Sequence, residues 1–364
     1  MNPRFKNCLS YDDVLLIPRF SNICSRSEIN ISSDLGNGIE LSLPIISSPM
    51  DTISEGAMAV AMGTRGGTAI IHRYNSIEEQ IRQIKIAYAY SNKTSSHDLM
   101  IGAAVGVSGD FIERAVMLNN EFVNFICVDV AHGHHILMKE ALSSLRLALG
   151  EDVHIMAGNV ATLEGINALA DWGADSARCN IGGGSICSTR IQTGHGMPGL
   201  QTIFDCAKTD RDIKIIADGG IRNSGDIVKA LAAGADAVMC GSLFAGTDET
   251  PGEIFQDMDG SSWKSYRGMA SKEAQVEWRG RYNSFEGVAT RVPYRGPMRH
   301  ILNDLERGMR SGFSYSGARN IEELHATAKF IQQTSSGLTD SHTHTRISIK
   351  RLCLVTTGIG MPNL

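Results

Sequence analysis

Eight short apolar runs alternate along the chain with longer segments of helical periodicity, and this alternation predicts a parallel (β/α)8 or TIM barrel of the α/β class. Two further observations favour a barrel over an open, doubly wound sheet. No G-x-G-x-x-G motif follows the first apolar run, where an open nucleotide-binding sheet normally carries one. In addition, polar and glycine-rich residues stand where seven of the runs end, and a barrel builds its active site there.

The apolar runs that we expect to form strands span 43–47, 68–72, 100–105, 125–129, 154–158, 174–179, 213–217 and 237–240. The segments with helical periodicity between them span 76–89, 111–119, 136–149, 163–172, 200–207 and 224–233. Residues 250–297 break this rhythm and are rich in glycine, serine, arginine and aromatics, so we expect an active-site flap inserted after the last strand. Residues 1–334 would then form one catalytic barrel, and the polar segment 335–364 a disordered C-terminal tail.

The composition limits the class of partner. The chain of 364 residues is 42% hydrophobic and 20% charged, as in globular proteins, and its net charge of -5 without a basic run excludes duplex nucleic acid. It holds no apolar stretch long enough to span a membrane and no apolar signal core near its start, so we expect a cytoplasmic protein. The eight cysteines include no C-x-x-C pair. Cys127, Cys179 and Cys240 lie in apolar runs and should be buried thiols.

The segment Asn180-Ile-Gly-Gly-Gly-Ser-Ile-Cys-Ser-Thr-Arg190 follows the sixth expected strand and suggests nucleophilic chemistry. Three successive glycines let the backbone approach a ligand closely, and Ser185 with backbone N–H groups can hold an anion. Cys187 lies on this loop among glycine, serine and threonine, where N–H donors would stabilise an attacking thiolate. The alternative is an incidental loop thiol, and the segment by itself does not decide between the two.

Two glycine-containing turns predict a phosphate site. Asp218-Gly-Gly220 follows the seventh expected strand, and Gly241-Ser242 follows the eighth. Barrels often bind phosphate after these strands through backbone N–H groups, although both segments can also be tight turns only. The Asp218 carboxylate can accept two hydrogen bonds, as the vicinal hydroxyls of a ribose would donate.

Other polar residues have both a functional and a structural interpretation. Thr189 can relay a proton to a leaving group or water, or it can cap the following helix. Asp129 can pair with a cofactor or a cationic group, or it can cap its loop. The cluster of His132, His134 and His135 suggests a metal site, but no carboxylate or cysteine stands at a matching spacing, so we expect local hydrogen bonds instead.

Six motifs stand in order along the chain: Ser48-Pro-Met-Asp-Thr52, Asp129-Val-Ala-His-Gly133, Met156-Ala-Gly-Asn159, Gly182-Gly-Gly-Ser-Ile-Cys-Ser-Thr-Arg190, Ala217-Asp-Gly-Gly220 and Tyr266-Arg-Gly-Met269. Together they resemble the IMP dehydrogenase/GMP reductase family, and the resemblance runs from about residue 5 to about residue 334. It implies a (β/α)8 barrel, usually a homotetramer, that acts on a purine nucleoside 5′-monophosphate with a nicotinamide cofactor.

The resemblance also implies roles for individual residues. Cys187 would attack C2 of the purine and form a covalent adduct, with Thr189 and Glu286 near the departing group. Asp129, Asn159 and Arg73 would bind the cofactor, and a monovalent cation is implied at Gly182, Gly184 and Cys187. The residues implied to contact the substrate are Ser48, Met50, Ser185, Asp218, Gly220, Gly241, Ser242, Tyr266, Gly268, Met269 and Gly287.

The flap favours a GMP reductase, which would convert GMP to IMP and ammonia with NADPH. Between Tyr266-Arg-Gly-Met269 and Glu286-Gly287 it is short, as in the reductases, and residues 73–100 leave no room for the tandem CBS insert that dehydrogenases usually carry. An IMP dehydrogenase without CBS domains, which would convert IMP to XMP with NAD+ and a monovalent cation such as K+, is the alternative. A non-catalytic purine nucleotide-binding barrel is a second alternative.

Four segments look more like a dehydrogenase or depart from both branches. Ser47-Ser-Pro-Met-Asp51 and Ala131-His-Gly-His134 are similar to the dehydrogenase motifs. Arg281-Tyr282 matches the pair that activates water in dehydrogenases, but it lies only a few residues before Glu286. The loop contains Gly182-Gly-Gly-Ser185 where the family usually has Gly-Pro-Gly-Ser, so we expect a more flexible loop and a looser positioning of Cys187.

Overall fold

The computed structural model describes residues 6–94, 99–282 and 286–341. At its centre is a closed barrel of parallel strands in the order β10-β11-β4-β5-β6-β7-β8-β9. The barrel strands are β4 (Ile45–Ser47), β5 (Thr68–Ile71), β6 (Ile101–Val105), β7 (Phe125–Asp129), β8 (His154–Val160), β9 (Ser176–Cys179), β10 (Lys214–Asp218) and β11 (Ala237–Cys240). Each expected strand is present, and the predicted barrel is confirmed.

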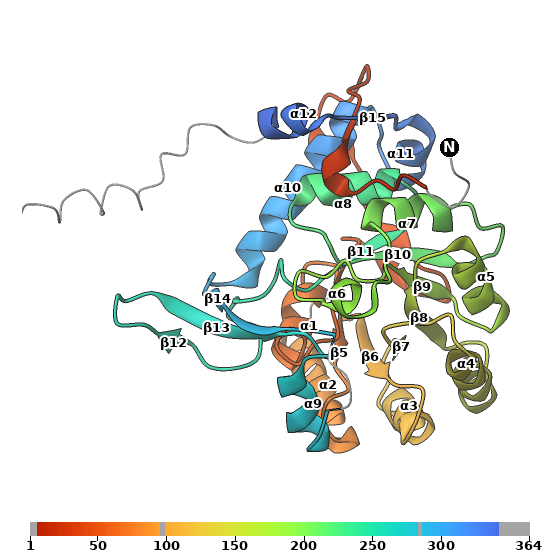
Figure 1. The fold of residues 1–364 in the computed structure, drawn as a ribbon, viewed down its shortest axis with the longest axis vertical. Helices are drawn as coiled ribbons and strands as arrows, with labels where there is room; N and C mark the ends of the chain where they lie inside the picture. The colour runs from red at the N-terminus through yellow and green to blue at the C-terminus, as the bar shows by residue number, and fades with distance from the viewer. Residues whose placement is uncertain (1–5, 95–98, 283–285, 342–364) are drawn as a thin grey trace, which may run out of the picture.

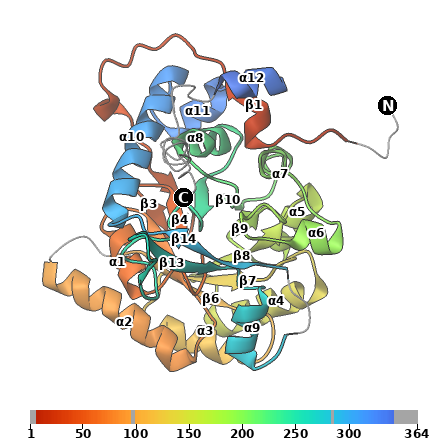
Figure 2. The same ribbon diagram turned by 60° about the vertical axis from the view of Figure 1, so that its left-hand side comes forward.

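Helices surround the barrel on its outside (Figures 1 and 2). They are α1 (Gly56–Gly63), α2 (Ile77–Thr94), α3 (Phe111–Asn120), α4 (Ile136–Leu149), α5 (Leu163–Asp171), α7 (Gly199–Cys206), α8 (Ser224–Ala232) and α10 (Met298–Ser316). All helices expected from periodicity are among them, whereas α1 and α10 were not expected. Polar caps start several of these helices: the Thr162 hydroxyl accepts the Gly165 N–H at 3.0 Å, and Asn223 Oδ1 accepts the Asp226 N–H at 2.9 Å.

The barrel interior changes from apolar to charged along its axis. At the end where the strands begin, Phe125, Met156 and Ile216 pack in one buried cluster with Leu35 and Leu41. The last two come from the hairpin of β2 (Ser33–Asp34) and β3 (Glu40–Leu41), which therefore closes this end. Side chains alternate between the two faces of a strand, so Asp218, two positions after the inward-facing Ile216, also points into the barrel. The opposite end of the barrel therefore presents polar groups.

The beginning and the end of the described chain pair with each other. Strand β1 (Val14–Leu16) is antiparallel to β15 (Phe330–Gln332), with Leu15 opposite Ile331. The remaining short elements near these strands are η1 (Tyr11–Asp13), η2 (Arg26–Glu28), α11 (Ile321–Thr327) and α12 (Ser335–Asp340). Helix α12 occupies the start of the segment that was expected to be a disordered tail, because Thr334 caps it by accepting the Gly337 N–H at 3.2 Å. Residues 342–364 lie outside the described part of the chain.

The segment expected to be a flap has a structure of its own. It contains an antiparallel sheet of β12 (Phe255–Gln256), β13 (Ser262–Arg267) and β14 (Ala289–Pro293), together with α9 (Lys272–Arg279). Figure 1 shows the sheet reaching out from one side of the barrel, with α9 beneath it. Lys264 fixes its base, because its buried ammonium donates to the carbonyls of Thr247 at 3.0 Å and Thr250 at 2.5 Å.

The cysteines of the apolar runs are buried, as expected: Cys127, Cys179 and Cys240 are free thiols inside the fold. Burial raises the pKa of the Cys127 thiol to about 12, so this sulfur is a small apolar group and not a nucleophile. No helix within the described residues is long and apolar enough to cross a membrane.

Replacing Phe125 by alanine tests the apolar end of the barrel. The Phe125 side chain is 0% exposed, and its ring lies 2.3 Å from where a Cβ on Gly102 would be. Because the ring fills this space, we expect Phe125→Ala to lower the free energy of unfolding by about 3–5 kcal/mol. The matched control Phe20→Ala removes a ring that is 91% exposed and should change it by less than about 0.5 kcal/mol. Urea unfolding measures both, and equal effects would contradict this packing.

Candidate active site

All of the residues implied for substrate, cofactor, cation and catalysis line one pocket. It has a volume of about 270 Å³ and lies at the carboxyl ends of the barrel strands, beneath the flap. The predicted residues that line it are Ser48, Met50, Arg73, Asp129, Asn159, Gly182, Gly184, Ser185, Cys187, Thr189, Asp218, Gly220, Gly241, Ser242, Tyr266, Gly268, Met269, Glu286 and Gly287. The fold thus brings together residues that are more than 200 positions apart in the sequence.

The loop that carries Cys187 leaves the end of β9 and packs against the turn after β10. Gly182 adopts a φ of +78°, which favours glycine, and a Cβ on Gly219 would lie 3.5 Å from the Gly184 nitrogen. The Cys187 N–H donates to the Gly184 carbonyl at 3.1 Å, which closes the loop around the half-buried thiol. The sulfur therefore sits on a short, tightly turned segment within the pocket.

A chain of two hydrogen bonds links Cys187 to a carboxylate. The Cys187 thiol donates to the Thr189 hydroxyl at 3.1 Å, and this hydroxyl donates to Glu286 Oε2 at 2.7 Å. The backbone holds the same residues together, because the Ser188 N–H donates to the Glu286 carbonyl at 2.8 Å. Helix α6 (Thr189–Thr193) has Ser188 as its N-cap residue, so Thr189 does not cap it. The arrangement can move a proton between the sulfur and the carboxylate.

The opposite side of the pocket gathers hydroxyl groups and glycine turns. The Ser185 hydroxyl lies 3.3 Å from the Tyr266 hydroxyl, and a Cβ on Gly241 would lie 3.5 Å from both Ser48 Oγ and Tyr266 Oη. Burial raises the pKa of Tyr266, so its hydroxyl remains a proton donor. Gly220 has a φ of +79°, a conformation that glycine adopts without strain. These donors surround a space suited to an anion such as phosphate.

Arg178 is a pocket residue that the sequence reasoning missed. Its guanidinium donates to Asp218 Oδ2 at 2.8 Å and also to Asp129 Oδ1, and its side chain is only 8% exposed. Asn159 Nδ2 donates to the same Asp218 oxygen at 2.8 Å. The available signal was an arginine inside an apolar run that was expected to be a barrel strand: such a charge needs a partner.

The electrostatics of Asp129 follow from these neighbours. Burial alone raises the pKa of the Asp129 carboxyl, but the charges of Arg178 and Arg73 outweigh burial and hold that pKa below its usual value. Arg73 also donates to the Asp129 carbonyl at 3.0 Å, and its Nε lies 3.6 Å from Asp129 Oδ2 in an ion pair. This side of the pocket therefore offers a carboxylate that two guanidinium groups hold in place.

The flap is fastened to the barrel beside the pocket. Arg267 at the end of β13 forms an ion pair with Asp51 at 2.6 Å, and the Asp51 N–H donates to the Met269 sulfur at 3.2 Å. On α9, the Trp278 ring stacks on the pocket residue Tyr74 with centroids 5.8 Å apart. These contacts close the pocket wall formed by the flap.

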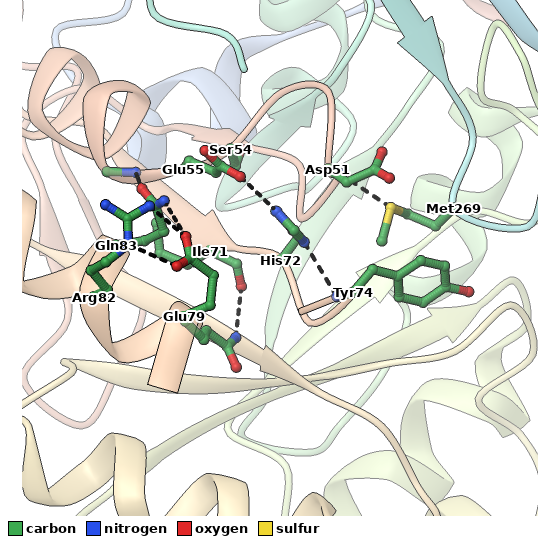
Figure 3. A network of polar contacts seen from close by, with 12 residues as sticks. Asp51, Ser54, Glu55, Ile71, His72, Tyr74, Glu79, Arg82, Gln83 and Met269 are labelled. Carbon is green, nitrogen blue, oxygen red and sulfur yellow. Dashed lines mark hydrogen bonds and ion pairs between the residues drawn. The ribbon is translucent and has the colours of Figure 1, made fainter. Parts of the chain in front are cut away.

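A buried histidine, His72, holds the backbone at Tyr74 in place. Figure 3 shows His72 between Glu55 and Tyr74, and Asp51 facing Met269. His72 Nδ1 accepts the Tyr74 N–H at 3.2 Å, so its proton is on Nε2, which lies 3.2 Å from Glu55 Oε1. The ring thereby fixes the backbone that carries both Arg73 and Tyr74.

The other histidines and the Arg281-Tyr282 pair lie elsewhere. His135 caps α4 by accepting the Leu137 N–H at 3.1 Å, and the His134 ring lies 6.0 Å from the Trp172 ring. Arg281 and Tyr282 are exposed and are not among the described residues that line the pocket, and Lys272 lies 4.8 Å over the Tyr282 ring. The carboxylate nearest to the Cys187–Thr189 pair is thus that of Glu286.

Comparison with known proteins identifies close relatives. The family model described as the IMP dehydrogenase / GMP reductase domain matches residues 8–344. An inosine-5′-monophosphate dehydrogenase from Borreliella burgdorferi is 37% identical over 400 residues, covering 94% of this chain and 98% of its own length. A GMP reductase from Leishmania major is 31% identical over 481 residues, covering 94% of this chain and 98% of its own length.

A solved structure has the same fold. It is a crystal structure of a cysteine-to-alanine variant of GMP reductase from Trypanosoma brucei in complex with guanosine 5′-monophosphate. The two structures superpose with a TM-score of 0.87 and share 31% sequence identity, and the match covers 94% of this chain and 98% of the other.

Replacing Arg178 by methionine tests its ion pairs with Asp129 and Asp218 in the pocket. In the folded chain Asp129 has a pKa below its unfolded value, so its ionised form contributes stability above the unfolded pKa of about 3.9 and loses it as the pH falls through the folded pKa. Without the positive charge of Arg178, burial destabilises the ionised Asp129 carboxylate more strongly. We expect Arg178→Met to lower the free energy of unfolding by roughly 3–5 kcal/mol near neutral pH.

The pH dependence of this loss makes the test specific. Because protonation removes the uncompensated charge, the difference in unfolding free energy between parent and variant should narrow between about pH 7.5 and about pH 5. The control Arg211→Met removes exposed pairs with Asp171 and Asp210, which solvent screens, so the unfolding free energy should change little at either pH. A difference for Arg178→Met that stays constant or widens on acidification would refute the explanation.

Proposed function

We propose that this chain, which belongs to the IMP dehydrogenase / GMP reductase family, reduces GMP to IMP and ammonia through a covalent adduct on Cys187. Membership makes it a purine nucleotide oxidoreductase of that family. The observation that carries the finer proposal is the hydrogen-bonded chain from the Cys187 thiol through Thr189 to Glu286. A reductase has to protonate a departing amine, and these hydrogen bonds place Glu286 where it can carry a proton to a group bonded beside the sulfur.

The nucleotide would lie with its phosphate at the hydroxyl side of the pocket. Ser185, Tyr266 and the backbone N–H groups around Gly220 and Gly241 would donate to the phosphate oxygens. Arg178 and Asn159 both contact Oδ2 of Asp218, so Oδ1 can accept from a ribose hydroxyl. The base would then lie beneath the flap residues Gly268 and Met269, with C2 facing Cys187.

The first half of the reaction would replace the amine by sulfur. The Cys187 proton passes through the Thr189 hydroxyl to Glu286, and the thiolate forms a bond to C2. Glu286 returns this proton to the exocyclic amine, and the C2–N bond breaks to release ammonia. The nucleotide is then held by a C2–S bond, and the protons and electrons of this half balance.

The second half would need a reduced nicotinamide cofactor, which the resemblance implies to be NADPH. The chemistry that such a cofactor would supply when bound is hydride donation to C2. Cys187 would then leave C2 as a thiolate and take up a proton to regenerate the thiol. The residues on the other side of the pocket fit such a group, because Arg73 and Asp129 present a cationic and an anionic group there and Asn159 presents an amide. Their part is to bind and orient the cofactor.

An IMP dehydrogenase is the second candidate. It is favoured by the Borreliella burgdorferi relative at 37% identity and by the presence of Arg281-Tyr282. In that reaction the adduct forms from IMP with loss of hydride to NAD+, and water releases XMP. A monovalent cation such as K+ would then be held by the carbonyls of Gly182, Gly184 and Cys187. We favour the reductase because Glu286, and not Arg281 or Tyr282, is hydrogen-bonded to the Thr189 hydroxyl.

The wider setting also follows from the resemblance. We propose a homotetramer that works in the cytoplasm, with the catalytic barrel as its single folded domain. A pocket that only binds a nucleotide would have no need for a thiol, a hydroxyl and a carboxylate in hydrogen-bonded sequence, so the non-catalytic alternative has less support.

Two assays separate the candidate functions. The protein is given GMP with NADPH and, in a second cuvette, IMP with NAD+, while the absorbance of the reduced nicotinamide is followed. We expect the absorbance to fall in the first cuvette. A rise in the second cuvette alone would identify a dehydrogenase, and no change in either with nucleotide binding intact would indicate a barrel that only binds.

Removing the sulfur tests the covalent step. Cys187→Ala should abolish turnover in whichever assay is positive, because Cys187 is the thiol hydrogen-bonded to Thr189. Burial raises the pKa of Cys240, the other described thiol that lines the pocket, so it does not replace the nucleophile. Cys24→Ala is the matched control: it removes an exposed thiol outside the pocket and should leave turnover unchanged. Residual activity above about 1% in Cys187→Ala would mean that the reaction does not pass through the adduct.

Neutralising the carboxylate tests the proton step. Glu286→Gln keeps the size of the side chain but cannot take up the thiol proton, so we expect kcat to fall by about 10²–10⁴-fold with little change in the KM for the nucleotide. The control Glu253→Gln changes an exposed glutamate that does not line the pocket and should not affect kcat. Comparable kcat values for both variants would exclude Glu286 as the acid.

A further inference from the structure

We infer that Asn180 is a positioning residue for the cysteine loop, and that Asn180 and Gly183 form a matched pair in which the Asn180 side chain fills the space that a side chain at 183 would need. This inference rests on the proposed role of Cys187 as nucleophile. It gives a reason, other than flexibility, for the glycine at the second position of the loop.

Asn180 connects three segments at the carboxyl end of the barrel. Its residue surface is 3% exposed, and its backbone N–H donates to the Val160 carbonyl at 2.9 Å. Its carbonyl accepts from Asn159 Nδ2 at 3.1 Å, and its own Nδ2 reaches the Gly219 carbonyl at 3.4 Å. The residue therefore lies between the end of β8, the turn after β10 and the loop that it begins.

The hydrogen bonds of the Asn180 side chain do not explain its presence. Its Oδ1 is buried with no hydrogen-bond partner among the described residues, and the bond from Nδ2 to Gly219 is long. A buried acceptor without a hydrogen bond is unfavourable, so the presence of the Asn180 amide needs another explanation. We find it in the volume of the Asn180 side chain, which occupies space next to two glycines.

Gly183 is the first of these glycines. A Cβ on Gly183 would lie 2.1 Å from Asn180 Nδ2 and 2.7 Å from its Cγ, which no packing tolerates. The backbone of Gly183 is not among those with positive φ, in contrast to Gly182 at +78°. Glycine is therefore required at 183 by the Asn180 side chain and not by the backbone conformation.

The Asn180 side chain is enclosed by the fold, since the residue is only 3% exposed and lies close to a second glycine. A Cβ on Gly199 would lie 3.2 Å from the same Nδ2. A side chain at 183 would consequently push the loop outward, away from the turn after β10. Gly184 packs on Gly219 in that turn and accepts the Cys187 N–H at 3.1 Å, so a displacement at 183 is transmitted to the sulfur.

The test is a double-mutant cycle of Gly183→Ala, Asn180→Gly and the combined variant, measured in whichever nicotinamide assay is positive. We expect Gly183→Ala to lower kcat by about 10²-fold and also to raise the KM for the nucleotide, because the displaced loop carries both the sulfur and the phosphate donor Ser185. Asn180→Gly makes room for the added methyl group, so the combined variant should recover at least about tenfold over Gly183→Ala. If the fold-change in kcat of the combined variant equals the product of the two single fold-changes, the pairing is overturned.

A second measurement does not depend on the reaction. The rate at which iodoacetamide alkylates Cys187 is determined by mass spectrometry for the same variants, with the thermal midpoint as a check of folding. Gly183→Ala should change this rate and the combined variant should restore it, even if neither GMP nor IMP is a substrate. If alkylation shows the coupling and both assays stay silent, the proposed function fails and the pairing stands; no coupling in either measurement refutes the pairing.

Gly337→Ala controls for the general effect of placing alanine at a glycine. The added methyl group would lie 3.3 Å from Gln333 Cβ and 3.6 Å from Thr334 Oγ1, and no residue of α12 lines the pocket. This variant should alter neither kcat nor the alkylation rate. A change equal to that of Gly183→Ala would show that the loop responds to global destabilisation and not to the contact with Asn180.

Discussion

One guanidinium, that of Arg178, lies inside the barrel between the carboxylates of Asp129 and Asp218. These residues come from three strands, β7, β9 and β10, and each carboxylate belongs to a different part of the pocket. Because a buried charge without a partner is very costly, neither carboxylate can move independently of the arginine. The pocket wall that would face a ribose and the wall that would face a nicotinamide are therefore fixed relative to one another by a single side chain.

Apolar side chains fill the rest of the barrel beneath this charged layer. Phe125, Met156 and Ile216 fill the end where the strands begin, and the β2–β3 hairpin covers them. The side chains of Arg178, Asp129 and Asp218 are mostly buried, so their ion pairs act in an environment of low dielectric constant, where the attraction is strong. The same burial makes Cys127 inert although it lies on the same inward face as Asp129.

The sequence was sufficient for those parts that depend on local pattern. Each barrel strand is a short apolar run, and polar and glycine-rich pocket residues follow seven of these runs, so both could be found without coordinates. The pocket residues of the flap, Tyr266, Gly268, Met269, Glu286 and Gly287, were found through the family resemblance. Arg178 could not be found in this way, because its role depends on Asp129 and Asp218, which only the closed barrel brings near. The pairing of Asn180 with Gly183 depends on side-chain volumes, and α12 on a cap at Thr334; neither gives a signal in hydrophobic periodicity.

The pairing of β1 with β15 bears on how the chain is made. Leu15 leaves the ribosome more than 300 residues before its partner Ile331, and Gln333 also donates to the Asp12 carbonyl at 2.6 Å. Contacts between such distant positions form late, since the loop between them must close first. Strand β1 therefore stays without its partner until β15 has been synthesised, which is after every strand of the barrel.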